Sequence, residues 1–90
     1  MPTITLDNQT IESIRSSLDF KKSILSMNRK AYLSRLKELE TRHGMTNAEF
    51  VTKFNAGEIG DEPDWFDWDF LLRALNRINK ELNILENTRL

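Results

Sequence analysis

Apolar residues in the last third of the chain recur at the spacing of an α-helix. Between Asp64 and Glu86 they follow one another at intervals of three and four residues. This stripe comprises Trp68, Leu71, Leu75, Ile78, Leu82 and Leu85. Such intervals place every member on one side of a helix, and the opposite side carries charged residues such as Arg73 and Arg77. The pattern predicts a long amphipathic C-terminal helix whose stripe the rest of the chain must cover.

A second helical pattern runs from Asp19 to His43, and its apolar residues form two stripes. One stripe comprises Leu18, Leu25, Tyr32, Leu36 and Leu39. The other comprises Phe20, Ile24, Met27 and Ala31. At about 100° per residue the centres of the two stripes lie about 120° apart. Either they form one broad core-facing surface, or the first contacts the C-terminal helix and the second contacts another chain.

We predict that the second stripe contacts another copy of the chain, which makes the protein a homodimer. Its interface comprises Phe20, Ile24, Met27, Asn28 and Ala31. In this arrangement the polar Asn28 sets the register, as a buried asparagine does in coiled coils.

Local sequence signals predict a short helix between the two long ones. Gly44 is placed to end the preceding helix. Thr46 and Glu49 form the T-x-x-E pattern of a capping box, and Met45 with Phe50 occupies the two positions of a hydrophobic staple. The short helix should therefore run from Asn47 to about Asn55. Its inner side should carry Phe50, Val51 and Phe54, and Pro63 suits the first position of the next helix.

The first 18 residues form an N-terminal lead. Thr3 to Leu6 alternates polar and apolar residues, which fits either an unstructured segment or an edge strand. Asp7 can cap a short helix from Asn8 to Ser16. The pair Ser16-Ser17 is a weak point for that helix, and Asp19 offers a second start. We therefore expect two helices on either side of this pair.

The elements together predict a single all-α domain over residues 1–90. It comprises a long helix, a short capped helix and a long C-terminal helix, folded as an antiparallel helical hairpin over residues 19–86 and dimeric. The two long segments, Asp19–His43 and Asp64–Glu86, would each span about 35 Å at 1.5 Å per residue. We therefore expect two rods of matched length.

Composition narrows the class of protein. The chain has 90 residues, is 39% hydrophobic and 30% charged, and carries a net charge of −1. It has no cysteine, which excludes disulfides and thiolate zinc sites and makes a cytoplasmic location the simplest expectation. Neither a secretory signal nor a membrane-spanning run is seen, so we expect no membrane contact. The near-neutral charge argues against a dedicated nucleic-acid binder.

Charge is distributed unevenly along the sequence. From Phe20 to Lys37 there are six basic residues and no acid, whereas from Asn47 to Asp69 there are seven acids and one lysine. The basic segment is either a solvated helix face or a surface for weak contact with nucleic acid or an acidic neighbour. The sequence therefore predicts a molecule with one basic and one acidic region.

Catalytic chemistry has little support in the sequence. His43 is the only histidine, and a histidine in the last turn of a helix usually supplies a favourable charge there. Phosphate-binding loops, nucleophile elbows and zinc-binding HExxH pairs are missing. The acidic run from Asp61 to Asp69 lacks the glycine and the bidentate glutamate of a calcium loop. We expect no catalytic residue, cofactor or metal.

The acidic run also holds both tryptophans, and we predict that it binds a protein partner. The candidate residues are Asp61, Glu62, Asp64, Trp65, Asp67, Trp68 and Asp69. Aromatic anchors surrounded by charge are typical of protein–protein hot spots, and Trp65 would be half covered there. In the alternative, both rings pack under the helix that contains Phe50, and the acids form a solvated helix start.

Motifs from Ala31 to Glu86 resemble a family of small prokaryotic proteins. The resemblance is carried by RHGMT (42–46), EFVTKF (49–54), GEIGD (57–61) and DWFDW (64–68). They are similar to the pattern YGM(S/T)xxEFxxKFxxGELGDDxDFxEW of proteins often encoded as the antitoxin half of toxin–antitoxin pairs. The chain has His43 where that pattern often has tyrosine, and Trp65 where it often has phenylalanine. Because the motif is mainly a glycine stop, a capped helix and an acidic restart, it implies fold more firmly than activity.

The resemblance implies a non-enzymatic protein that neutralises a cognate toxin by direct binding. The alternative is a structural or regulatory homodimerisation module, with weak nucleic-acid contact through the basic segment Lys21–Lys37. The neighbouring reading frame distinguishes the two, because a small ribonuclease-like or nucleotidyltransferase-like neighbour favours the antitoxin hypothesis.

Overall fold

The computed structural model describes residues 7–90, and within that range the chain forms three α-helices and no strand. The helices are α1 (Asn8–His43), α2 (Asn47–Asn55) and α3 (Pro63–Glu86). This confirms the predicted all-α class, the bounds of the short helix and Pro63 as an initial helical residue. The strand considered for Thr3–Leu6 lies outside the described residues.

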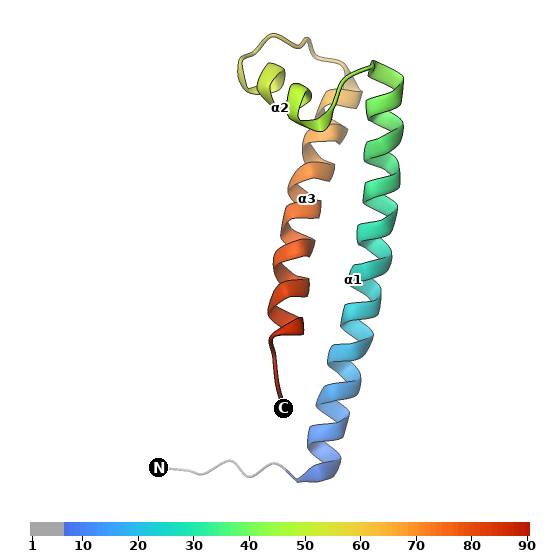
Figure 1. The fold of residues 1–90 in the computed structure, drawn as a ribbon, viewed down its shortest axis with the longest axis vertical. Coiled ribbons are helices and arrows are strands. Elements are labelled where there is room, and N and C mark those ends of the chain that lie inside the picture. The colour runs from blue at the N-terminus through green and yellow to red at the C-terminus, as the bar shows by residue number, and fades with distance from the viewer. Residues whose placement is uncertain (1–6) are drawn as a thin grey trace.

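The long helices α1 and α3 pack side by side in opposite directions, and α2 lies across one end of the pair (Figure 1). The molecule measures 57 × 28 × 19 Å, so it is an elongated hairpin with a closed end at α2 and an open end where α1 begins and α3 ends. The predicted helical hairpin is therefore confirmed.

The long helix that was predicted to start at Asp19 begins at Asn8 instead and runs without a break to His43. Asp7 is its cap, as expected, because its Oδ1 accepts a hydrogen bond from the Thr10 N–H at 2.7 Å. The helix passes through Ser16 and Ser17, and the Ser17 hydroxyl donates to the Ser13 carbonyl at 3.0 Å. The predicted break and second start at Asp19 are wrong, because extending an existing helix gains a hydrogen bond per residue and two serines oppose it only weakly.

The two long helices differ in length, which corrects the expectation of matched rods. Helix α1 has 36 residues and α3 has 24, equivalent to about 54 Å and about 36 Å at 1.5 Å per residue. The first turns of α1 therefore extend beyond the end of α3 (Figure 1). The chain after α3 continues alongside them, where the Arg15 guanidinium donates to the Leu90 carbonyl.

The turn between α1 and α2 follows the predicted local signals. Gly44 adopts a left-handed conformation with φ 61° and its N–H bonds to the Glu40 carbonyl, which ends α1. The Thr46 hydroxyl accepts from the Glu49 N–H at 3.1 Å, and the Glu49 carboxylate accepts from the Thr46 N–H at 3.3 Å. This confirms the capping box. The Glu40 carboxylate adds a further tie by accepting from the Asn47 N–H at 2.9 Å.

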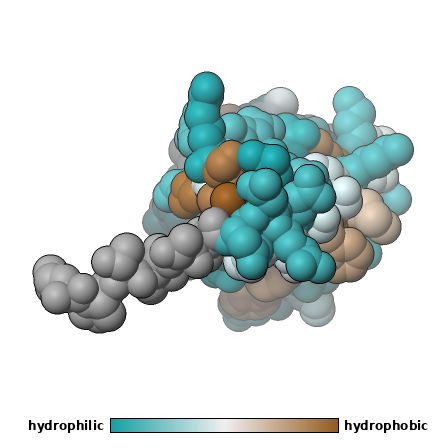
Figure 2. Space-filling model, turned by 90° about the horizontal axis from the view of Figure 1, so that it is seen from below, coloured by the Kyte–Doolittle hydropathy of each residue, from teal (hydrophilic) through white to brown (hydrophobic). Residues whose placement is uncertain are grey.

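The hydrophobic core is concentrated at the closed end. It comprises Leu36, Leu39, Phe50, Trp65, Trp68 and Leu71. Met45 and Phe54 pack against this cluster, whereas Val51 is 40% exposed and was wrongly assigned to the inner side of α2. The predicted stripe of α3 continues the core toward the open end, where Ile78 and Leu85 are buried. Viewed from the open end, hydrophobic atoms are visible between hydrophilic groups (Figure 2).

Candidate functional site

Both tryptophans lie inside the core of the closed end. Trp68 is fully buried, its ring stacks on Phe50 at 4.4 Å, and its Nε1 donates to Asn47 Oδ1 at 2.8 Å. Trp65 is only 9% exposed and packs against the imidazole of His43 with ring centres 4.4 Å apart. The expectation that Trp65 is half covered and available as an anchor is therefore wrong. The structure supports the alternative, in which α2 and the last turn of α1 close over both rings.

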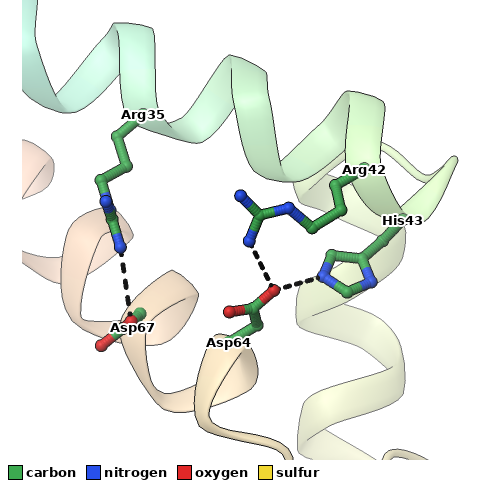
Figure 3. A network of polar contacts seen from close by, with 5 residues as sticks. All are labelled: Arg35, Arg42, His43, Asp64 and Asp67. Carbon is green, nitrogen blue, oxygen red and sulfur yellow. Dashed lines mark hydrogen bonds and ion pairs between the residues drawn. The ribbon is translucent and has the colours of Figure 1, made fainter.

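Asp64 connects the end of α1 to the start of α3. Its Oδ2 accepts a hydrogen bond from Arg42 Nη1 at 2.9 Å and lies 2.8 Å from His43 Nε2 (Figure 3). The hydrogen bond with His43, followed by that with Arg42, lowers the pKa of Asp64 below its ordinary value of 3.8. Asp64 is thus engaged within the chain, where it links the last turn of α1 to the first turn of α3.

Two more acids of the predicted site also face cations of the chain. Asp67 Oδ2 lies 3.5 Å from Arg35 Nη2 across the hairpin (Figure 3), and Asp69 Oδ2 lies 3.1 Å from Arg73 Nε on the same helix. Exposed pairs of this kind contribute little to stability. They do reduce the negative charge that α3 itself offers to a partner.

The remaining acids lie in the segment that joins α2 to α3. Glu58, Asp61 and Glu62 are exposed, and within residues 7–90 no ion pair involves them. Glu62 is the residue immediately before α3. The available negative charge of the predicted site is therefore at this joining segment.

Two phenylalanines on α3 are exposed beside that charge, and the sequence analysis missed them. Phe66 is 57% exposed and Phe70 is 62% exposed. They are four residues apart, so they lie on the same side of α3 one turn from each other. The Phe66 ring makes an edge-on contact with Phe54 of α2, at 6.4 Å between ring centres. We call these two side chains the Phe66–Phe70 surface.

A groove between α1 and α3 adjoins Phe70. Its volume is about 290 Å³, and its lining includes Tyr32, Phe70, Ala74 and Arg77. The groove thus combines apolar side chains with a polar rim of two arginines, one glutamate and one asparagine. An apolar side chain from a partner would fit beside Phe70 without displacing a helix.

The second stripe of α1 is turned to the side of the α1–α3 contact, and of its predicted residues only Asn28 lines the groove between α1 and α3. Phe20 is 70% exposed, Met27 is 67% exposed and Ile24 is 41% exposed, and Asn28 and Ala31 are exposed as well. Helix α3 covers only the first stripe, in which Leu36 and Leu39 are buried. The alternative of one broad core-facing surface is therefore wrong, and no element within residues 7–90 covers Phe20 or Met27 of the second stripe.

Other kinds of site were also considered. Among residues 7–90, no three histidine or carboxylate side chains are grouped so that they could hold a metal ion. None of the helices in this part of the chain is long and apolar enough to cross a bilayer. Comparison with known proteins finds no family model, no curated protein and no solved structure that matches the chain.

Proposed function

We propose that this chain is a non-enzymatic protein-binding module of the antitoxin kind, which neutralises a partner toxin through its Phe66–Phe70 surface. The observation that supports this proposal is the exposure of two neighbouring phenylalanines, 57% and 62%, on one side of α3. Large aromatic side chains exposed together are typical of interaction sites, since burying them against a partner removes apolar area from water. The antitoxin assignment itself rests on the motif resemblance.

Charge next to this surface favours a basic partner. Glu62 precedes Phe66 by four residues, and Asp61 and Glu58 lie in the same joining segment. Their carboxylates would attract a positively charged protein during its approach, which raises the association rate at low salt. The partner surface that fits is therefore basic where it meets the joining segment next to Phe66 and apolar where it meets Phe66 and Phe70. The edge beyond Phe70 carries Arg73 and Arg77 and does not favour a basic group.

The core beneath the surface makes the site suitable for tight binding. Phe66 follows Trp65 and precedes Trp68, and both tryptophans are buried in the cluster that fixes the start of α3. The backbone that carries Phe66 is thus already ordered before any partner arrives. Binding to an ordered surface loses less conformational entropy than binding to a flexible one.

Co-expression with the protein encoded by the neighbouring reading frame tests the proposal. Wild type should restore growth that the neighbour alone arrests, and the two proteins should purify together. The double substitution Phe66→Ala/Phe70→Ala should abolish protection and weaken binding by at least about 30-fold, equivalent to about 2 kcal/mol at a hot spot. Ile84→Ala is the matched control, because Ile84 is 64% exposed on the same helix but far from the closed end.

Charge variants separate the two contributions. Asp61→Asn/Glu62→Gln should slow association at low salt and leave the dissociation rate nearly unchanged. The proposal fails if the neighbour is neither toxic nor bound. It also fails if the phenylalanine variant, with an unchanged helical circular dichroism spectrum, protects as well as wild type.

A further inference from the structure

We propose that the outer face of α1 pairs with the same face of a second copy of this chain in an antiparallel homodimer. This face is separate from the Phe66–Phe70 surface, and the proposal goes beyond toxin binding. Its central residues are Phe20 and Met27, which are 70% and 67% exposed in the single chain. Their large apolar side chains have no covering partner among residues 7–90.

The outer face has the spacing of a coiled-coil seam. Its positions alternate at intervals of four and three residues along α1. They comprise Ser13, Ser17, Phe20, Ile24, Met27, Ala31, Ser34 and Glu38. A repeat of this kind keeps one narrow stripe turned toward a partner helix over about 38 Å. Apolar side chains occupy the middle of the seam, and its ends carry three serines and Glu38, which is level with Ser13 of the second copy in the antiparallel pair.

Side-chain size favours the antiparallel orientation. When the two-fold axis passes between Leu25 and Ser26, Phe20 lies opposite Ala31 of the second copy and Ile24 lies opposite Met27. Each layer then combines side chains of complementary size, as well-packed helix interfaces require. A parallel pair in register would instead place Phe20 against Phe20 and Ala31 against Ala31, which crowds one layer and leaves a void in another.

Charges beside the seam favour the same orientation. In the antiparallel pair, Lys21 faces Asn28 of the second copy and Lys30 faces Ser23, so no two cations are directly opposed. In the parallel pair, Lys30 would face Arg35 of the second copy at both edges, and the part of the Arg35 charge that its own Asp67 leaves uncompensated would select against that pairing. The neutral residues beside the seam therefore favour antiparallel pairing with α1 of a second copy.

An acidic helix from an unrelated protein is the competing occupant, because Lys21 and Lys30 flank the outer face. Two other basic residues of α1 contact α3 instead, since Arg29 donates to Asn79 and Arg35 pairs with Asp67. The sizes of the seam side chains favour a second copy, because the two-fold axis places the large Phe20 opposite the small Ala31. The two occupants respond oppositely to salt. Screening the repulsion between two basic faces strengthens the homodimer, whereas screening an attraction weakens an acidic complex.

Sedimentation equilibrium on the whole chain, from about 5 µM to about 500 µM, measures the association. We expect a weak dimer whose dissociation constant falls as NaCl is raised. Phe20→Ala should raise the dissociation constant at least about tenfold, because each substitution occurs twice in the dimer. Ala31→Phe should raise it similarly by crowding. The combined Phe20→Ala/Ala31→Phe variant should recover most of the affinity, because it exchanges the large and small partners.

Leu33→Ala is the control, because Leu33 is 40% exposed on another side of α1 and should not alter the dissociation constant. A chain that stays monomeric throughout the concentration range overturns the proposal. It is likewise overturned if an acidic amphipathic peptide, with glutamate beside a leucine seam, binds the face while the chain alone does not associate.

Cross-linking tests the orientation, and the chain suits it because it contains no cysteine. Phe20→Cys and Ala31→Cys proteins are mixed and oxidised with oxidised glutathione. The mixture should form the heterologous disulfide, whereas either protein alone should not, because equivalent positions in the antiparallel pair lie about 16 Å apart along the axis. A disulfide between two Phe20→Cys chains would indicate the parallel pair and overturn the proposal. Toxin protection by the Phe20→Ala variant should remain intact, which keeps this test independent of the proposed function.

Discussion

Asp64 is the residue through which the two long helices are joined at their closed end. Its carboxylate lies within 2.9 Å of side-chain nitrogens from Arg42 and His43. It also sits in the first turn of α3, where a negative charge interacts favourably with the helix dipole. One side chain therefore connects the end of one helix to the start of another.

The stability of the hairpin should depend on pH through Asp64. Its pKa is lowered in the folded chain by the hydrogen bonds with His43 and Arg42, so the unfolded chain takes up its proton first on acidification. The stabilisation is fully present above the ordinary pKa of 3.8 and is lost as pH falls through the lower folded value. The difference in unfolding free energy between wild type and Asp64→Asn should thus shrink as pH falls below about 4.

Urea unfolding at a series of pH values measures this difference. Asp67→Asn is the control, because Asp67 forms only the exposed 3.5 Å pair with Arg35. A difference between wild type and Asp64→Asn that did not change down to pH 2 would show that Asp64 contributes nothing through its charge.

Two sets of aromatic residues on α3 differ in how far their exposure could be predicted from the sequence. The phenylalanine spacing of Phe66 and Phe70 was visible as an i, i+4 pair outside the α3 stripe, and that signal could have identified them. The burial of Trp65 was not visible in this way. It depends on His43 and α2 folding back over the ring, which is a tertiary contact between segments with no local pattern in common.

At the scale of the elements, α2 depends on its N-terminal cap. Thr46→Ala removes the hydroxyl that accepts from the Glu49 N–H, and it should lower the free energy of unfolding by about 1 kcal/mol. Thr52→Ala is the matched control, because the Thr52 hydroxyl only bonds back to the Ala48 carbonyl within the same helix. Alanine has the higher helix propensity, so this control should be neutral or slightly stabilising.

Urea denaturation with a constant slope is the measurement for both threonine variants. An unchanged midpoint for Thr46→Ala would contradict the role of the cap. The bounds of α2 were predictable because a capping box and a glycine stop act within a few residues. The continuity of α1 was not, because helix extension through Ser16 and Ser17 is a cooperative property of the whole helix.

Across the whole molecule, packing is strongest at the closed end and weakest at the other. Leu36 and Leu39 are each 2% exposed, whereas the first turns of α1 project beyond α3 (Figure 1). Amide hydrogen exchange should therefore be slowest around these leucines and around Trp68, and fastest among helical amides between Asn8 and Ile14. Exchange measured by NMR at low protein concentration tests this gradient, and uniform protection along α1 would contradict it.

The hairpin itself was predictable because two long periodic segments joined by a short capped helix leave few alternatives. It was harder to predict which surfaces of the hairpin are buried within the chain and which stay exposed. Sequence identified the outer stripe of α1, including Phe20 and Met27, but could not tell whether α3 covered it. That depends on which side of α1 the second long helix occupies, a choice set by the whole core.

The position of the tryptophans has a practical consequence for spectroscopy. Trp65 and Trp68 belong to one aromatic cluster, with ring centres 6.1 Å apart, and no other tryptophan is present in the chain. Tryptophan fluorescence therefore senses only the environment near α2, whereas circular dichroism at 222 nm sums over every helical peptide. Fraying that begins near Asn8 changes ellipticity while the emission maximum stays fixed. Comparing the two signals thus distinguishes fraying at the open end from unfolding of the whole chain.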